Sequence, residues 1–141
     1  MSFTVPMRQT AWDGVLRWAL LAGGLFDLAF GIAVLVAWES VLRLMGLTPI
    51  PGAEVFVKLA AFLSLGLGLT FAMGAVAPWR YHANINIAFV MRFGGAAFFG
   101  WFVFGGVLPF ALIGMAAGEF VLGVLHFIYS RRTAVAAAGP Q

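Results

Sequence analysis

The chain contains no cysteine and few charged residues, and each shortage excludes a class of function. Without cysteine there is no disulfide, thiolate metal site or iron–sulfur ligation. Only 9% of the residues are charged, and the net charge of +3 rests on eight basic and five acidic side chains. A nucleic-acid-binding surface needs a denser basic patch than this. We therefore expect no nucleic-acid partner.

Catalytic motifs are missing as well. The sequence has no Gly-x-Ser-x-Gly elbow, no His-Glu-x-x-His pair and no glycine-rich phosphate loop. The glycine pairs all lie in apolar surroundings. We expect a protein that is not an enzyme.

Apolar residues are abundant. They make up 63% of the 141 residues, whereas soluble domains are roughly 45–50% apolar. A chain this short cannot bury so much apolar surface in a soluble core. The first apolar stretch has no small-residue cleavage site after it, so we expect a retained helix and not a secretory signal. The composition predicts an integral membrane protein.

Four segments are long enough to cross a bilayer, which takes about 20 apolar residues per helix. Gly105-Gly106 and Pro109 separate the last two, because glycine favours a helix end and proline a helix start. The predicted fold is an all-α, four-helix membrane bundle in one domain covering residues 1–141. The end of this range, residues 134–141, is expected to be a low-complexity tail. The predicted spans are Leu16–Ala37, Leu59–Ala77, Ile85–Phe104 and Val107–Tyr129.

The basic residues predict the orientation. In the positive-inside rule, Lys and Arg mark the cytoplasmic side. On this basis both termini and the loop Pro78–Asn84 are expected in the cytoplasm. The membrane is expected to be a bacterial inner membrane. The basic residues on that side are Arg8, Arg17, Arg80, Arg131 and Arg132; Arg43 and Lys58 lie on the other side, beside Glu39 and Glu54.

Two further patterns concern local structure. Within the longest loop, Trp38–Lys58, the segment Glu39–Met45 is expected to form a short interfacial helix that ends at Gly46. Small residues recur every four positions, a spacing that lets membrane helices approach closely. We expect these residues to build the bundle, with docking against another subunit as the alternative. They are Ala60, Ser64, Gly68 and Ala72 in the second helix, and Gly114 and Gly118 in the fourth.

Three ionisable residues lie inside predicted spans: Asp27, Arg92 and Glu119. At 1.5 Å per residue, all three lie roughly 10–15 Å from the cytoplasmic ends of their helices. They therefore share one layer, and Arg92 is expected to bridge one or both acids. Three interpretations remain open: a buried salt-bridge cluster that fixes helix register, a proton- or ion-linked site with a formal charge of −1, and a pocket for a lipid or quinone head group.

His126 lies seven residues after Glu119, on the same helix face. It is a candidate ligand for a haem or other pigment, although a hydrogen-bonding role is the simpler interpretation. His82 is a candidate second ligand, but its place in a loop argues against a paired haem site. No third ligand lies nearby, so no metal site is expected.

The order of features resembles small bacterial four-helix membrane proteins of the DoxX-like type. The segments that carry the resemblance are Leu21–Gly31 (LAGGLFDLAFG), Leu42–Pro51 (LRLMGLTPIP), Ala77–Tyr81 (APWRY) and Met91–Gly94 (MRFG), with Glu119 as the acid of the fourth helix. Some DoxX-like proteins are associated with oxidoreductase or quinone systems. The resemblance therefore implies a setting in a redox complex.

These observations lead to one functional hypothesis and two alternatives. The hypothesis is a small accessory subunit of a larger energy-transducing membrane complex, respiratory or photosynthetic. Its expected partners are lipid and other membrane subunits, which it meets through helix faces. We expect no cofactor of its own, with lipid, quinone or pigment bound at most at a subunit interface. The alternatives are a small proton-linked transporter, with Asp27 as its acid, and a quinone- or lipid-binding module.

Overall fold

The computed structural model describes residues 11–78 and 80–138. It contains α1 (Ala11–Leu44), α2 (Glu54–Val76), α3 (His82–Phe104), a short 3-10 turn η1 (Phe110–Leu112) and α4 (Ile113–Ala138). The described residues form no β-strand. The four α-helices are long and apolar enough to cross a membrane. The all-α, four-helix class predicted from composition is therefore correct, as expected of a multi-pass membrane protein.

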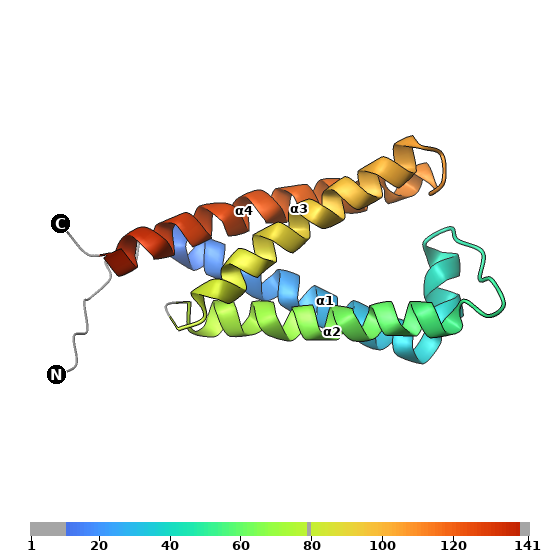
Figure 1. The fold of residues 1–141 in the computed structure, drawn as a ribbon, viewed down its shortest axis with the longest axis horizontal. Coiled ribbons are helices and arrows are strands. Elements are labelled where there is room, and N and C mark those ends of the chain that lie inside the picture. The colour runs from blue at the N-terminus through green and yellow to red at the C-terminus, as the bar shows by residue number, and fades with distance from the viewer. Residues whose placement is uncertain (1–10, 79, 139–141) are drawn as a thin grey trace.

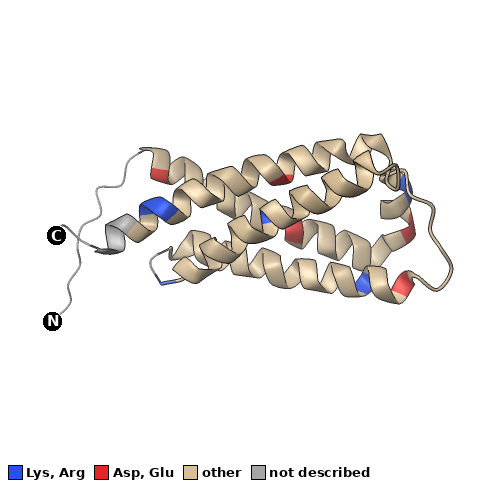
Figure 2. Cartoon of the chain, turned by 45° about the horizontal axis from the view of Figure 1, so that its top comes forward, with Lys and Arg blue, Asp and Glu red and all other residues tan. Residues whose placement is uncertain are grey.

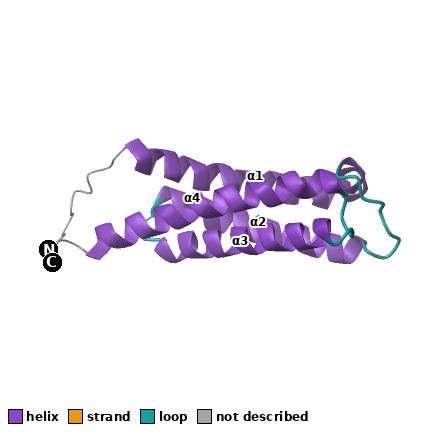
Figure 3. Ribbon diagram, turned by 90° about the horizontal axis from the view of Figure 1, so that it is seen from above, coloured by secondary structure: helices purple, strands orange, loops and turns teal. Residues whose placement is uncertain are grey.

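The helices are arranged as two hairpins, α1–α2 and α3–α4 (Figure 1). The start of α1, the end of α4 and the α2–α3 connection lie at one end of the bundle, which we call the terminal end. The α1–α2 and α3–α4 connections lie at the opposite end, the loop end, as the view from above also shows (Figure 3). The hairpins lie close together at the terminal end and diverge towards the loop end (Figure 1).

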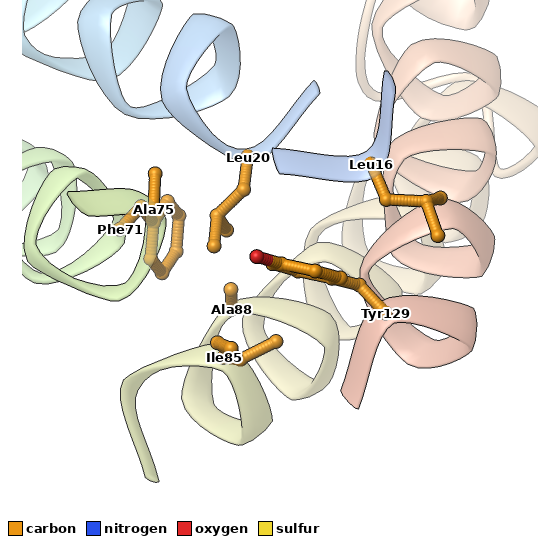
Figure 4. Packing of buried hydrophobic residues seen from close by; sticks show 7 residues of the cluster. All are labelled: Leu16, Leu20, Phe71, Ala75, Ile85, Ala88 and Tyr129. Carbon is orange, nitrogen blue, oxygen red and sulfur yellow. The ribbon is translucent and has the colours of Figure 1, made fainter. Parts of the chain in front are cut away.

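The side chains that hold the hairpins together form a buried core on the terminal side. All four helices contribute to it, and the side chains converge between them (Figure 4). The aromatic ring of Tyr129 packs among aliphatic residues there. The members of this core are Leu16, Leu20, Phe71, Ala75, Ile85, Ala88 and Tyr129.

Helix α1 has a sharp break near its end. Ala37 has the non-helical angles φ −139° and ψ 47°, so the segment Trp38–Leu44 turns away from the main axis of α1 (Figure 1). This segment corresponds to the short helix expected at Glu39–Met45. Residues in the loop that follows lie near the α3–α4 turn, since a Cβ on Gly46 would lie 3.6 Å from Pro109 Cγ.

Glycine in the left-handed region closes two helices in the same way. Gly46 has φ +75° and Gly106 has φ +73°. In each case the following amide bonds to a carbonyl five residues back: Leu47 N to Leu42 O at 2.8 Å, and Val107 N to Phe102 O at 2.9 Å. These are Schellman caps, which glycine accommodates without strain.

The helix bounds differ from the predicted spans at several ends. Hydropathy alone marks apolar runs, whereas helices α2 and α3 begin three to five residues earlier, in polar sequence at Glu54 and His82. Helix α4 begins later than predicted, because Val107 belongs to the turn after Gly106. It then continues to Ala138, so residues 134–138 of the predicted low-complexity tail are helical, as alanine favours. Residues 139–141, like Arg8, lie outside the described part.

The small residues that recur every four positions pack against another helix in α2 but not in α4. Gly68 packs against α1, where a Cβ would lie 2.7 Å from the Gly24 carbonyl oxygen. Gly24 and Gly68 thus form the close helix contact that small residues permit. A Cβ added to Gly114 or Gly118 would meet no other part of the described structure within 4 Å. The expectation that these two glycines build this bundle is wrong, because their face of α4 points away from the other helices.

Charged side chains also close the terminal end. Arg17, on α1, donates from Nε to the Ala75 carbonyl at 2.6 Å and from Nη2 to the Val76 carbonyl at 3.3 Å. These carbonyls belong to the last turn of α2, which has no further helical donors. A cation at a helix C-terminus is also favoured by the helix dipole. Arg17 therefore ties the end of α2 to α1.

Candidate functional site

Arg92 joins the two acidic residues of the membrane interior. Its Nη1 lies 2.6 Å from Glu119 Oε1, and its Nη2 lies 2.6 Å from Asp27 Oδ2. Nη2 also donates to the Gly23 carbonyl at 3.0 Å. The structure thus brings together all three residues of the expected charged layer. Figure 2 shows charged positions near the two ends of the bundle and a separate group near its middle.

Glycines allow these contacts to form. A Cβ on Gly23 would lie 3.0 Å from Arg92 Nη2, and a Cβ on Gly95 would lie 3.2 Å from Glu119 Oε2. Larger side chains at either position would compete with the ion pairs for the same space. The ion pairs therefore explain why glycine occupies both positions.

The cluster is buried but not completely closed. The Arg92 side chain is 4% exposed, and those of Asp27 and Glu119 are 14% and 16% exposed. The Phe71 ring lies 5.1 Å from the guanidinium carbon and adds a cation–π contact from α2. Residues from all four helices therefore surround the charge, and two formal negative charges face one positive charge.

The main physical effect of the cluster is to connect the hairpins. Asp27 belongs to the α1–α2 hairpin, whereas Arg92 and Glu119 belong to α3–α4. The Asp27–Arg92 pair is thus a buried polar link between the two hairpins, which also meet through the apolar core and through Asn84–Thr70 and Arg132–Asp13 contacts nearer the terminal end. In addition, Ser64 on α2 donates to the Asp27 carbonyl at 3.2 Å.

His126 lies inside the bundle beside Arg92. It is 0% exposed, and its ring centroid lies 6.2 Å from that of Phe71. Its Cε1 lies 3.6 Å from the position of a Cβ on Gly23, close to the Arg92 guanidinium. A pigment on the outer surface would not reach this ring, and the hypothesis that His126 contacts a ligand or pigment stays a prediction.

Neither ring nitrogen of His126 has a side-chain hydrogen-bond partner among the described residues, and the same holds for Arg92 Nε. The Ala19 backbone lies close enough to the ring to form a weak hydrogen bond with it. Buried polar groups normally have partners, from protein or from ordered water.

A group of polar side chains lies between His126 and the terminal end. Ser130, one turn after His126, donates from its hydroxyl to Asn86 Oδ1. His82 Nε2 lies 3.1 Å from the Ser130 carbonyl, which can only accept, so Nε2 carries the proton. His82 is thus placed by a backbone contact and is not paired with His126. Asn86 and Ser130 were not among the predicted site residues, although a polar residue in an apolar span is the signal that marks them.

The loop end carries an open pocket of about 710 Å³. It lies between the last turns of α1 and the start of α2, where each helix has an exposed ion pair of its own: Arg43 with Glu39 at 3.1 Å, and Lys58 with Glu54 at 2.5 Å. Both pairs are exposed and contribute little to stability. The sequence predicted a short helix in this loop but not the pocket, which forms because α1 turns at Ala37.

Among the residues that the structure describes, no three His, Asp or Glu side chains are grouped closely enough to hold a metal ion.

No protein-family model, no curated protein and no solved structure matches this chain. The resemblance to DoxX-like proteins therefore remains a prediction, and what can be inferred of the function rests on the geometry of the bundle.

Proposed function

We propose that this protein is a small accessory subunit of a larger membrane complex and performs no chemistry of its own. The observation that carries the proposal is the pairing of Arg92 with both Asp27 and Glu119. The three ionisable residues of the membrane interior already bind one another. They hold the hairpins together, as a structural role requires.

The same pairing weakens one alternative. An anionic quinone or lipid head group would need free donors from Arg92. Both terminal nitrogens already contact protein acceptors, and the remaining Nε is buried. A head group would therefore have to displace a carboxylate from the guanidinium.

A surface for a partner helix is also available. Gly114 and Gly118 lie four residues apart on a face of α4 that has no neighbour within the described chain. Small residues at this spacing allow close approach of membrane helices. We place the main contact with a partner subunit there. By the positive-inside rule we place both termini in the cytoplasm of a bacterial inner membrane, and by the DoxX-like resemblance we assign the complex to electron transport or photosynthesis.

Purification of the tagged chain in mild detergent tests this proposal. We expect it to elute within a larger complex of defined membrane subunits, and Gly114→Leu with Gly118→Leu to release it as a 15.1 kDa species. The matched control is Gly66→Leu, because Gly66 on α2 also has no described neighbour within 4 Å. If the parent chain migrates alone from native membranes, the accessory-subunit proposal is wrong. If Gly66→Leu releases it and the α4 variant does not, the partner surface lies on α2.

A further inference from the structure

We propose that Asp27 and Glu119 form a proton-binding site that is loaded from the terminal end only, through His126 and the polar side chains beside it. This inference goes beyond the accessory role and does not depend on which complex the protein joins. It rests on the buried imidazole of His126, which has no side-chain hydrogen-bond partner among the described residues, and on the unequal distribution of polar residues along the bundle.

The charge of the cluster provides the binding site. Two carboxylates share one guanidinium, so the fully ionised cluster has a formal charge of −1. An uncompensated charge in a low-dielectric interior is costly. Binding one proton to a carboxylate oxygen forms one O–H bond and makes the cluster neutral. No other bond forms or breaks in this step.

His126 lies where a proton would have to pass. Its ring and the Arg92 guanidinium both lie within 4 Å of one point above Gly23, and Arg92 touches both acids. A neutral imidazole can accept a proton at one nitrogen and release one from the other, provided that neither is held by a fixed partner. Neither His126 nitrogen is bonded to a side chain of the described structure, and the nearby Ala19 backbone makes at most a weak hydrogen bond.

The charged groups near His126 belong to the cluster and lie on one side of the ring. Arg92 approaches from α3, with Asp27 of α1 and Glu119 of α4 behind it. Helix α2 contributes only the Phe71 ring, which carries no titratable group. The net negative charge of the cluster attracts a proton to the acids, whereas Arg92 opposes a positive charge on His126 itself, so the ring holds a transferred proton only briefly.

The path continues to the terminal end through hydrogen-bonding side chains. Ser130 lies one turn beyond His126 and is bonded to Asn86, and His82 contacts the Ser130 carbonyl. His82 begins α3 next to the α2–α3 connection and is partly exposed. The imidazoles of His82 and His126 and the Ser130 hydroxyl can each carry a proton, and water molecules between them would complete the path inward from this end.

No such series exists on the other side of the cluster. The segments of α1, α3 and α4 that lead towards the loop end, residues 28–36, 93–104 and 113–118, contain no ionisable or hydroxyl side chain. On α2 only Ser64 lies on that side before Lys58, and it donates to the Asp27 backbone. The site therefore opens to one side, and we expect proton binding without transport across the membrane.

Infrared difference spectroscopy of the full chain in lipid nanodiscs tests the binding site. Acidification should produce a carboxylic C=O band, and this band should be lost or changed in Asp27→Asn or Glu119→Gln. If no such band forms at any pH at which the protein stays folded, the cluster does not bind a proton and the proposal is overturned.

The path is tested by the rate at which this band appears after a pH jump. His126→Phe should slow it roughly 100-fold, the usual contribution of a positioned proton-transfer group, with the final amplitude unchanged. A purely structural role of His126 would change the amplitude instead. If His126→Phe does not fold, Ser130→Ala tests the next step and should also slow the rate.

Ser64→Ala is the matched control, because it removes the hydroxyl on the loop side of the cluster. We expect it to leave the rate unchanged. A slower rate in Ser64→Ala but not in His126→Phe or Ser130→Ala would show that protons arrive from the loop end. Sustained proton flux in parent proteoliposomes, abolished by Asp27→Asn, would overturn the one-sided path and favour a transporter.

Discussion

Replacing Arg92 with leucine should destabilise the bundle strongly. Arg92 has two ion-pair contacts of 2.6 Å and one carbonyl contact of 3.0 Å, and its side chain is 4% exposed. Its removal leaves two buried carboxylates without a counter-charge. We expect a loss of about 3–5 kcal/mol in the free energy of unfolding, the usual range when one partner of a buried pair is removed. This corresponds to roughly 10²- to 10⁴-fold in the unfolding equilibrium.

The matched control removes all three charges at once. In the triple variant with leucine at positions 27, 92 and 119, no uncompensated charge remains. Replacement of a buried ion network by apolar residues is often neutral or stabilising. We therefore expect the triple variant to lie within about 2 kcal/mol of the parent, much closer than Arg92→Leu alone. The comparison separates the penalty of an unpaired charge from the loss of packing volume.

Both variants can be compared by equilibrium unfolding in mixed micelles, followed by tryptophan fluorescence and circular dichroism. If Arg92→Leu is as stable as the parent, Arg92 does not link the hairpins and the structural interpretation of the cluster is wrong. If the single and triple variants lose equal stability, packing volume and not charge accounts for the loss.

Three further outcomes are expected. Gly24→Ala should destabilise the bundle by about 1–3 kcal/mol, because its methyl group would press on the backbone of α2; Gly66→Ala in the same unfolding assay is the open-surface control and should not. Arg17→Gln should cost about 1–2 kcal/mol by leaving the last carbonyls of α2 without their charged donor, and hydrogen exchange should then increase at that end of α2. Since the chain has no cysteine, Thr48→Cys and Ala83→Cys can be labelled singly: an impermeant thiol reagent applied to intact cells should modify position 48 only, and the reverse pattern would invert the predicted topology.

The depth of the charged layer could be predicted from the sequence by helix geometry alone. A rise of 1.5 Å per residue places Asp27, Arg92 and Glu119 at one depth once the spans are recognised, and the cost of an isolated charge in lipid requires them to meet. Both arguments use only distance along a helix and solvation. The structure adds the partners: Arg92 takes both acids, together with the Gly23 carbonyl.

The direction in which each helix face points could not be predicted from the sequence. Gly68 and Gly114 have the same small-residue signature, yet Gly68 packs against α1 and Gly114 faces outward. The spacing of small residues says that a helix can be approached closely, not which helix approaches it. Likewise, the continuation of α4 to Ala138 depends on helix propensity, which a hydropathy pattern does not register.

Sequence by itself therefore determined the membrane class, the number of helices, the two glycine-capped turns and the depth of the charges, because each follows from local composition or from distance along one helix. Only the tertiary structure decided that α1–α2 and α3–α4 form hairpins that diverge at the loop end, that His126 points inward beside Arg92, and that Asn86 and Ser130 meet below it. These features depend on the rotation of each helix about its own axis. That rotation is set by contacts between helices far apart in the chain. In a helix that is apolar on all sides, the sequence does not show which face makes those contacts.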